Sequence, residues 1–177
     1  YWIDAPIALK KALGTPVGYH IYNWHEIPFN INYPHFLPAR DTFLDGAKKL
    51  KDAGLYLFPY INAVSWEMND ADEGYAENFA TVGKYGAAIR ADGSALDVIY
   101  PQKKRDGTMT RLVPMCPTCL RWHGIIEEVT RGMEEQLPID GIYFDEIAAH
   151  VPFSCRGKGH MHLPGGGSYW VEGYNRM

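Results

Sequence analysis

The segment Asp140-Gly-Ile-Tyr-Phe-Asp-Glu146 constrains the fold of this chain more than any other feature of the sequence. It is typical of a strand, and because side chains alternate along a strand, Ile142 and Phe144 should share one face. Tyr143 and Asp145 should share the opposite face. The apolar pair would then pack on helices, and the strand would end by presenting the Asp145 carboxylate at its C-terminal tip. The alternative interpretation is that Asp145 caps the following turn or neutralises a neighbouring base.

Helical and strand-like segments alternate along the chain. Apolar spacing, polar caps and terminal glycines or prolines predict helices over residues 4–14, 40–53 and 118–137, with further helices near 75–85 and from 168 onward. Runs rich in β-branched and aromatic residues predict strands over 17–24, 55–63 and 141–145. Shorter strands over 88–90, 96–100 and 110–113 surround two Asp-Gly turns. The chain is therefore expected to be an α/β protein.

This alternation predicts parallel βα units with right-handed crossovers. The loops after the strands are long and the turns before them are short, as in a (β/α)8 or TIM barrel, whose site lies at the C-terminal ends of the strands. Such a barrel needs about 250 residues and eight strands. We therefore expect residues 1–177 to be a single-domain fragment, a partial TIM barrel equal to roughly its N-terminal half, with a β-hairpin excursion on the loop face. The remainder of the barrel or a second chain would cover the sheet edges.

The amino-acid composition limits the kinds of partner that this chain can bind. The chain has 177 residues, of which 46% are hydrophobic and 14% aromatic, so it can bury a core and still have rings to line a binding surface. Flat aromatic faces suit the apolar faces of sugar rings. A net charge of −4 with no basic stripe argues against nucleic acid as a partner. No apolar run approaches the ~20 residues that cross a bilayer, and three cysteines do not suggest a disulfide scaffold.

Polar and aromatic groups are concentrated at the far ends of the three main strands. They are His20, Tyr22, Trp24 and His25, then Tyr60, Asn62, Trp66 and Glu67, and finally Asp145 and Glu146. Hydrolysis of a glycosidic bond requires two carboxyl groups, ~5 to 5.5 Å apart for retention and ~6.5 to 9.5 Å apart for inversion. Asp145 is the candidate nucleophile, and Glu67 and Glu146 are candidates for the second group. Neighbours on a strand point apart, which weakens Glu146, and a strand outside this chain could supply the acid.

Aromatic and imidazole side chains are candidates for holding a sugar. We expect substrate binding by Trp24, His25, Tyr60, Asn62, Trp66, His160 and His162. The structural alternative for Trp24 and Trp66 is packing beneath their own loops. His20 lies toward the middle of its strand, where an interior, hydrogen-bonded histidine is expected. No cofactor is expected for this chemistry.

A zinc site is a separate hypothesis. Cys116 and Cys119 form a C-x-x-C pair, and Cys155, His160 and His162 follow, so the sequence contains enough soft ligands for zinc. Against this, Cys119 would open a helix and no second C-x-x-C pair is present. The loop 155–167 is instead expected to fold over the rim, with its histidines binding hydroxyl groups or anchoring the loop. Its Gly165-Gly-Gly167 run lacks the pattern of a phosphate-binding loop.

The motifs around the third strand resemble those of a known family. The run contains Gly141-Ile-Tyr-Phe-Asp145, Pro152, Cys155, His160, Pro164-Gly-Gly-Gly167, Trp170 and Gly173-Tyr174, and upstream Pro59-Tyr-Ile-Asn62, Trp66, Met115-Cys-Pro117 and Trp122 also fit. This pattern resembles glycoside-hydrolase-like (β/α) barrel domains grouped as a domain of unknown function. These are distantly similar to endo-α-N-acetylgalactosaminidase and α-galactosidase-type barrels. The resemblance implies a TIM barrel, a carbohydrate ligand and Asp145 in the position of the fourth-strand nucleophile.

Three functional hypotheses follow. The first is a glycoside hydrolase, retaining in mechanism, acting through Asp145. The second is a non-catalytic carbohydrate-binding or scaffold domain, which would bind sugar without hydrolysing it. The third is a zinc-dependent hydrolase built on Cys116, Cys119, Cys155 and His160.

Overall fold

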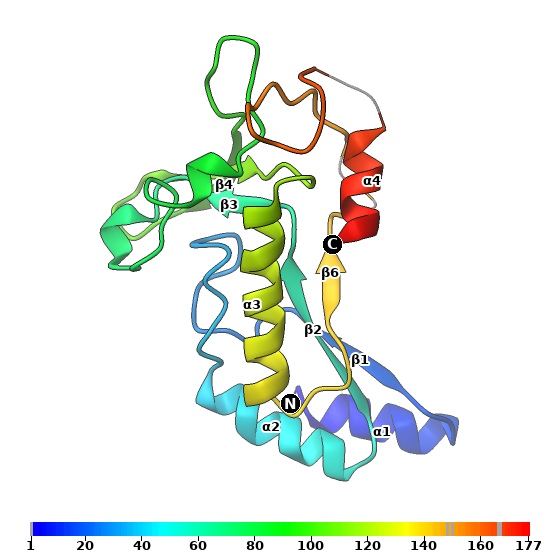
Figure 1. Ribbon diagram of the computed structural model, residues 1–177. Coiled ribbons are helices and arrows are strands. Elements are labelled where there is room, and N and C mark those ends of the chain that lie inside the picture. Colours follow the sequence, from blue (N-terminus) through cyan, green and yellow to red (C-terminus); the bar gives the residue numbers. More distant parts are fainter. Residues whose placement is uncertain (1, 148, 150, 166–167) are drawn as a thin grey trace.

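Three parallel strands form the sheet that was expected from the sequence (Figure 1). They are β1 (Gly18–Ile21), β2 (Tyr56–Asn62) and β6 (Tyr143–Asp145), in the order β1-β2-β6. The structure is a computed structural model that describes residues 2–147, 149, 151–165 and 168–177, without the side chain of Asp72. Tyr60 lies opposite Tyr143 and Asn62 opposite Asp145, so the C-terminal ends of β2 and β6 meet at one edge.

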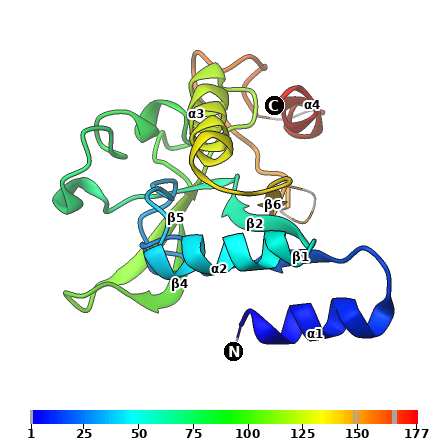
Figure 2. The ribbon, with the colours of Figure 1, turned by 90° about the horizontal axis from the view of Figure 1, so that it is seen from below.

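The helices of the chain are α1 (Asp4–Leu13), α2 (Asp41–Asp52), α3 (Leu120–Gln136) and α4 (Tyr169–Arg176), and all four confirm predicted helices. Of these, α2 and α3 share a core with the parallel sheet. Leu57 and Ile61 of β2 are fully buried in the same core as Leu50 of α2 and Met133 of α3. Figure 2 shows α2 lying across the sheet, with α3 seen nearly end-on. Among the described residues, no helix combines the length and apolar character needed to cross a bilayer.

A second, antiparallel sheet lies beyond the end of β2. It contains β3 (Ser65–Glu67), β5 (Met109–Pro114) and β4 (Val98–Lys103), in the order β3-β5-β4. The β4–β5 pair confirms the predicted hairpin excursion, and its turn is built by Asp106, whose carboxylate accepts the backbone N–H of Thr108 at 2.9 Å. The short strand β3 was not predicted, because three residues carry too little periodicity to reveal it.

The helix predicted near residues 75–85 is wrong. Instead, one short 3-10 turn, Ala71–Glu73, precedes this segment, and a second, Gly83–Tyr85, forms its end. Asn78 accepts the backbone N–H of Thr81 through its side chain at 3.0 Å, which offers the backbone an alternative to helical bonds. Gly83 lies so close to Trp66 that an added Cβ would fall 2.8 Å from the indole ring. Tertiary packing therefore outweighs the local helical pattern.

Two apolar clusters make up the core, and α3 joins them. Met133 of α3 belongs to the cluster beneath the parallel sheet. Trp122 and Ile126, further toward the N-terminus of the same helix, belong to a cluster under the second sheet and α4. The apolar spacing that predicted this helix is confirmed at those three buried positions.

Candidate functional site

Asp145 ends β6 on the face that also carries Tyr143, and the register places it beside Asn62 of β2. This is the face predicted for it. The charge of Asp145 acts on the side chains of His20 and Tyr22, which come from β1 and from the residue that follows β1. Burial lowers the pKa of His20, and the Asp145 carboxylate opposes that shift. Burial and then the Asp145 charge raise the pKa of Tyr22.

The rings beside Asp145 are tyrosines and a histidine. The His20 ring lies 4.0 Å from the ring of Tyr143 and 4.5 Å from that of Tyr22, centroid to centroid. Tyr22 stacks on Tyr60 at 4.8 Å. Tyr22 and Tyr143 remain 43% and 41% exposed, so their faces are accessible to a ligand. The sequence predicted a structural role for His20. Its place beside Asp145 follows from the β1–β2 register, in which His20 pairs with Phe58.

Glu146 follows Asp145 in a left-handed backbone conformation, with φ of 65°, which is uncommon for a residue with a Cβ. Asn62 donates from Nδ2 to Glu146 Oε2 at 3.0 Å, and the Tyr100 hydroxyl donates to Oε1 at 3.3 Å. Burial, with the Glu146 charge, raises the pKa of Tyr100 to about 12. The unusual backbone at a strand end thus coincides with two adjacent acids.

Asn62 holds the turn after β2 as well as Glu146. Its Oδ1 accepts the backbone N–H groups of Val64 and Ser65, each at 2.9 Å. These two bonds fix the amide so that Nδ2 faces Glu146. Asn62 is 1% exposed and therefore acts on the site by positioning another side chain.

Glu67, the other predicted acid, lies in a buried ion pair. It is 0% exposed on β3, and Lys104 Nζ donates to its Oε2 at 3.1 Å. Its Oε1 accepts the backbone N–H of Asn69 at 3.2 Å. The structure thus gives Glu67 a partner on the β4–β5 hairpin, whereas Glu146 is the acid held next to Asp145.

The tryptophans and His25 lie in the core rather than on a rim. Trp24 is 0% and Trp66 1% exposed, and their indole N–H groups donate to the Tyr60 carbonyl and to Asp70, each at 2.6 Å. This matches the structural alternative, and it leaves neither ring a free face for a sugar. His25 is fully buried and donates from Nδ1 to the Ile27 carbonyl at 2.6 Å. Burial lowers its pKa to about 4, so it is neutral at physiological pH.

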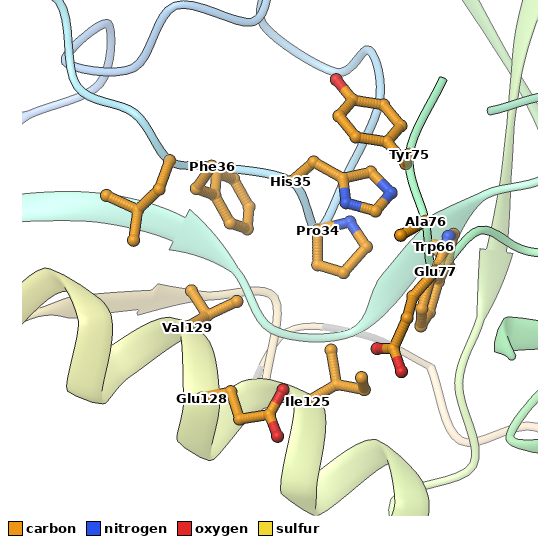
Figure 3. Close-up of a pocket in the computed structure, with 11 residues that line it drawn as sticks. Pro34, His35, Phe36, Trp66, Tyr75, Ala76, Glu77, Ile125, Glu128 and Val129 are labelled. Atoms are coloured by element: carbon orange, nitrogen blue, oxygen red, sulfur yellow. The ribbon is translucent and has the colours of Figure 1, made fainter. Parts of the chain in front are cut away.

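A separate apolar groove lies between the 34–37 loop, the 75–77 segment and α3 (Figure 3). Within it, His35 stacks on Tyr75 at 3.6 Å and pairs through Nε2 with the buried Asp70 at 2.9 Å. Glu77 and Glu128 line its mouth. None of its lining residues ends a strand of the parallel sheet, so the groove is distinct from the surface around Asp145.

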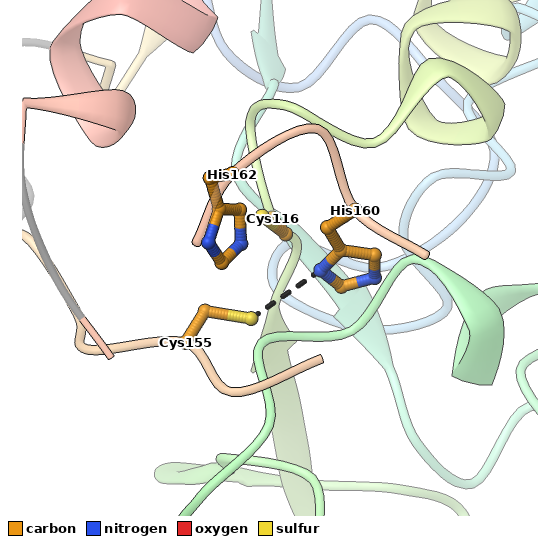
Figure 4. A group of neighbouring side chains, drawn as sticks. All are labelled: Cys116, Cys155, His160 and His162. Carbon is orange, nitrogen blue, oxygen red and sulfur yellow. Dashed lines mark hydrogen bonds between the residues drawn. The ribbon is translucent and has the colours of Figure 1, made fainter. Parts of the chain in front are cut away.

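His160 and His162 lie with Cys116 and Cys155 in a group of their own (Figure 4). The loop predicted to cover the rim therefore has its histidines directed at two thiols; Gly166 and Gly167 of that loop lie outside the described residues. Cys119, predicted as a zinc ligand, is not a member, because its Sγ faces the Tyr85 carbonyl at 3.8 Å. His162 takes its place. A hydrogen bond from the Cys116 thiol, with help from His160, lowers the pKa of Cys155.

The parallel sheet, its helices and the acids at its strand ends define the chain as part of an α/β domain. The chain belongs to the family described as "Domain of unknown function (DUF6259)", which matches residues 3–177. This confirms the resemblance found in the sequence.

Two relatives carry names of the same class. The chain is 30% identical over 174 residues to a "Putative glycoside hydrolase" of Bacteroides thetaiotaomicron, which covers 96% of this chain and 24% of the relative. It is 26% identical over 176 residues to "Putative glycoside hydrolase 22789" of Monosiga brevicollis, covering 93% of this chain and 14% of the relative. The chain thus spans a quarter or less of the length of these relatives.

Solved glycosidases share the fold. The ligand-free α-N-acetylgalactosaminidase of Bifidobacterium bifidum superposes with a TM-score of 0.65 at 16% identity, over 98% of this chain and 26% of that one. The galactosidase domain of an α-galactosidase-sucrose kinase superposes with a TM-score of 0.50 at 9% identity, over 80% and 18%. At such identities the likeness concerns the fold alone.

Proposed function

We propose that this chain is the nucleophile-bearing part of a glycoside hydrolase catalytic domain, and that its parallel sheet is roughly the N-terminal half of a TIM barrel. The observation that carries the proposal is the place of Asp145, at the C-terminal tip of β6, beside Asn62 and facing an accessible surface of aromatic rings. Active sites of such barrels lie at this end of the strands. The names of the relatives and the neighbouring solved glycosidases support the same class.

In a retaining reaction the Asp145 carboxylate attacks the anomeric carbon and forms a covalent glycosyl-enzyme, while an acid donates a proton to the leaving oxygen. Water then hydrolyses the intermediate. The general acid must hold a proton at working pH. Both oxygens of Glu146 accept hydrogen bonds, and Glu67 is buried in an ion pair with Lys104, so neither group is placed to donate a proton to a leaving oxygen. We therefore assign the acid to a carboxyl group outside residues 1–177, with Glu146, held by Asn62, positioning the sugar.

The substrate is a carbohydrate that can stack on tyrosine. Tyr22 and Tyr143 provide exposed ring faces on one side of Asp145, and His20 lies between their rings. Because the solved neighbours are named as an α-N-acetylgalactosaminidase and a galactosidase, aryl α-galactosides and aryl α-N-acetylgalactosaminides are the first substrates to test.

The test replaces Asp145 in the complete natural protein that contains this chain. Asp145→Asn should lower kcat by on the order of 10^4-fold, with sugar affinity by calorimetry changed only a few-fold. Asp92→Asn, the same change at the exposed turn between Arg90 and Ser94, is the matched control and should leave kcat intact. A fluorinated sugar that traps the intermediate should label the peptide carrying Asp145.

Two results would redirect the proposal. Activity of Asp145→Asn within tenfold of the wild type would remove this residue from the mechanism. Wild-type protein that binds sugar but hydrolyses none of the aryl glycosides would favour the non-catalytic carbohydrate-binding domain instead.

A further inference from the structure

Two cysteines and two histidines from separate parts of the chain converge on one point (Figure 4). One ligand atom from each of Cys116, Cys155, His160 and His162 lies within 4.8 Å of all the others. Cys116 follows the end of β5 and precedes α3, whereas the other three belong to the loop before α4. Such a grouping of soft ligands is distinct from the surface around Asp145.

The ring hydrogen bonds of both histidines leave one nitrogen of each available to the group. His160 donates from Nε2 to the Tyr85 carbonyl at 3.0 Å, so its Nδ1, 3.3 Å from Cys155 Sγ, carries the lone pair. His162 donates from Nδ1 to the Leu163 carbonyl at 2.8 Å. Its Nε2 is buried and, within the part of the chain that the structure describes, has no hydrogen-bond partner. Backbone carbonyls that fix the ring in this way are typical second-shell partners of metal-binding histidines.

Both sulfur atoms are buried, so a negative charge on a thiolate there would need a partner. Cys116 and Cys155 are both 0% exposed. The backbone N–H groups of Ile89 and Gly157 point at Cys155 Sγ, at 3.4 and 3.3 Å. Donors aimed at sulfur stabilise a thiolate, and buried charges in proteins are paired or coordinate metals.

We propose that Cys116, Cys155, His160 and His162 bind one zinc ion. Two thiolates and two imidazoles in tetrahedral arrangement are a typical zinc donor set. Zinc–sulfur bonds of about 2.3 Å and zinc–nitrogen bonds of about 2.0 Å give a tetrahedron with edges of about 3.3 to 3.8 Å. The ligand atoms, all within 4.8 Å, need to approach one another by at most about 1.5 Å.

Four protein ligands close the coordination sphere, which makes the site structural. A catalytic zinc keeps a position open for water, and this set leaves none. The zinc-dependent hydrolase therefore does not follow from this site. The ion instead ties the loop of residues 151–165 to the start of α3 and, through His160, to the turn at Tyr85. Tyr169 of α4 reinforces the tie, because its hydroxyl accepts the Cys155 N–H at 2.7 Å and its ring stacks on His162 at 3.9 Å.

The test measures metal content in the intact protein purified without chelators, and needs no enzymatic assay. Elemental analysis should find one zinc per chain. Cys116→Ser and His162→Gln should each reduce that stoichiometry at least tenfold, whereas Cys119→Ser is the matched control and should retain it. Replacing zinc with Co²⁺ should give the visible absorption of a tetrahedral ion together with thiolate-to-metal charge transfer.

A second readout follows the loop itself. Chelation of the wild type should accelerate hydrogen exchange in residues 151–165 at least tenfold and leave exchange in β1 unchanged. Three results would overturn the proposal: zinc absent after incubation with Zn²⁺, zinc lost from Cys119→Ser but kept by His162→Gln, or a Cys116–Cys155 disulfide found by mass spectrometry under non-reducing conditions.

Discussion

Lys104 gives a quantitative test of the structural role assigned to Glu67. Its side chain is 7% exposed, and its ammonium group lies 3.1 Å from Glu67 Oε2, with Glu73 Oε1 at 3.3 Å and the Asn69 carbonyl as further partners. At 3.1 Å and an effective dielectric constant of 20, the attraction between two unit charges is about 5 kcal/mol. Lys104→Met keeps the apolar stem but leaves the Glu67 carboxylate buried without a counter-ion. We expect the local free energy of unfolding to fall by about 3 to 5 kcal/mol.

Hydrogen exchange with mass spectrometry measures this loss in the complete natural protein. Peptides over β3 and β5 should exchange about 10² to 4 × 10³ times faster in Lys104→Met, since 1.4 kcal/mol corresponds to a factor of ten. The double variant Glu67→Gln/Lys104→Met should recover at least half of the loss, because it removes both charges. Arg111→Met is the matched control: Arg111 is 45% exposed, and Asp97 keeps Arg90, so the change should cost less than about 1 kcal/mol. If Lys104→Met also lost less than about 1 kcal/mol, the reasoning would be refuted.

Two further predictions concern stability. Gly173→Ala in α4 should lower the free energy of unfolding by about 1 to 3 kcal/mol, because an added Cβ would lie 2.5 Å from the Pro117 backbone. Gly124→Ala in α3 should raise it by about 0.5 to 1 kcal/mol, because a Cβ there meets nothing within 4 Å. The midpoints of urea unfolding measure both changes. Burial lowers the pKa of His25 to about 4, below that of an unfolded histidine, so its contribution to stability is complete above about pH 6.5 and is lost as the pH falls toward 4. His25→Gln should flatten that pH dependence of unfolding; an unchanged slope would contradict the neutral, buried state.

The sequence predicted the local elements of the fold well, for a physical reason. Alternation along a strand and the spacing of apolar residues in a helix depend only on neighbours, so β1, β2, β6 and the face of Asp145 could be read directly. The helix α3 was predicted in the same way from its apolar spacing. The failed helix near residues 75–85 marks the limit, because packing against Trp66 and side-chain capping by Asn78 decide that segment.

The tertiary structure alone decided which distant side chains meet. Trp24 and Trp66 are of the residue type that stacks on sugars, yet packing buries both. Tyr22 and Tyr143 are the rings that remain exposed beside Asp145. Glu67 forms an ion pair with Lys104, and His162 rather than Cys119 lies in the group around Cys155. Such pairings depend on the paths of loops, which are fixed by contacts between residues far apart in the chain. The residue types and the strand-end position of the acid were thus determined by the sequence, whereas the partners of each group were determined by the fold.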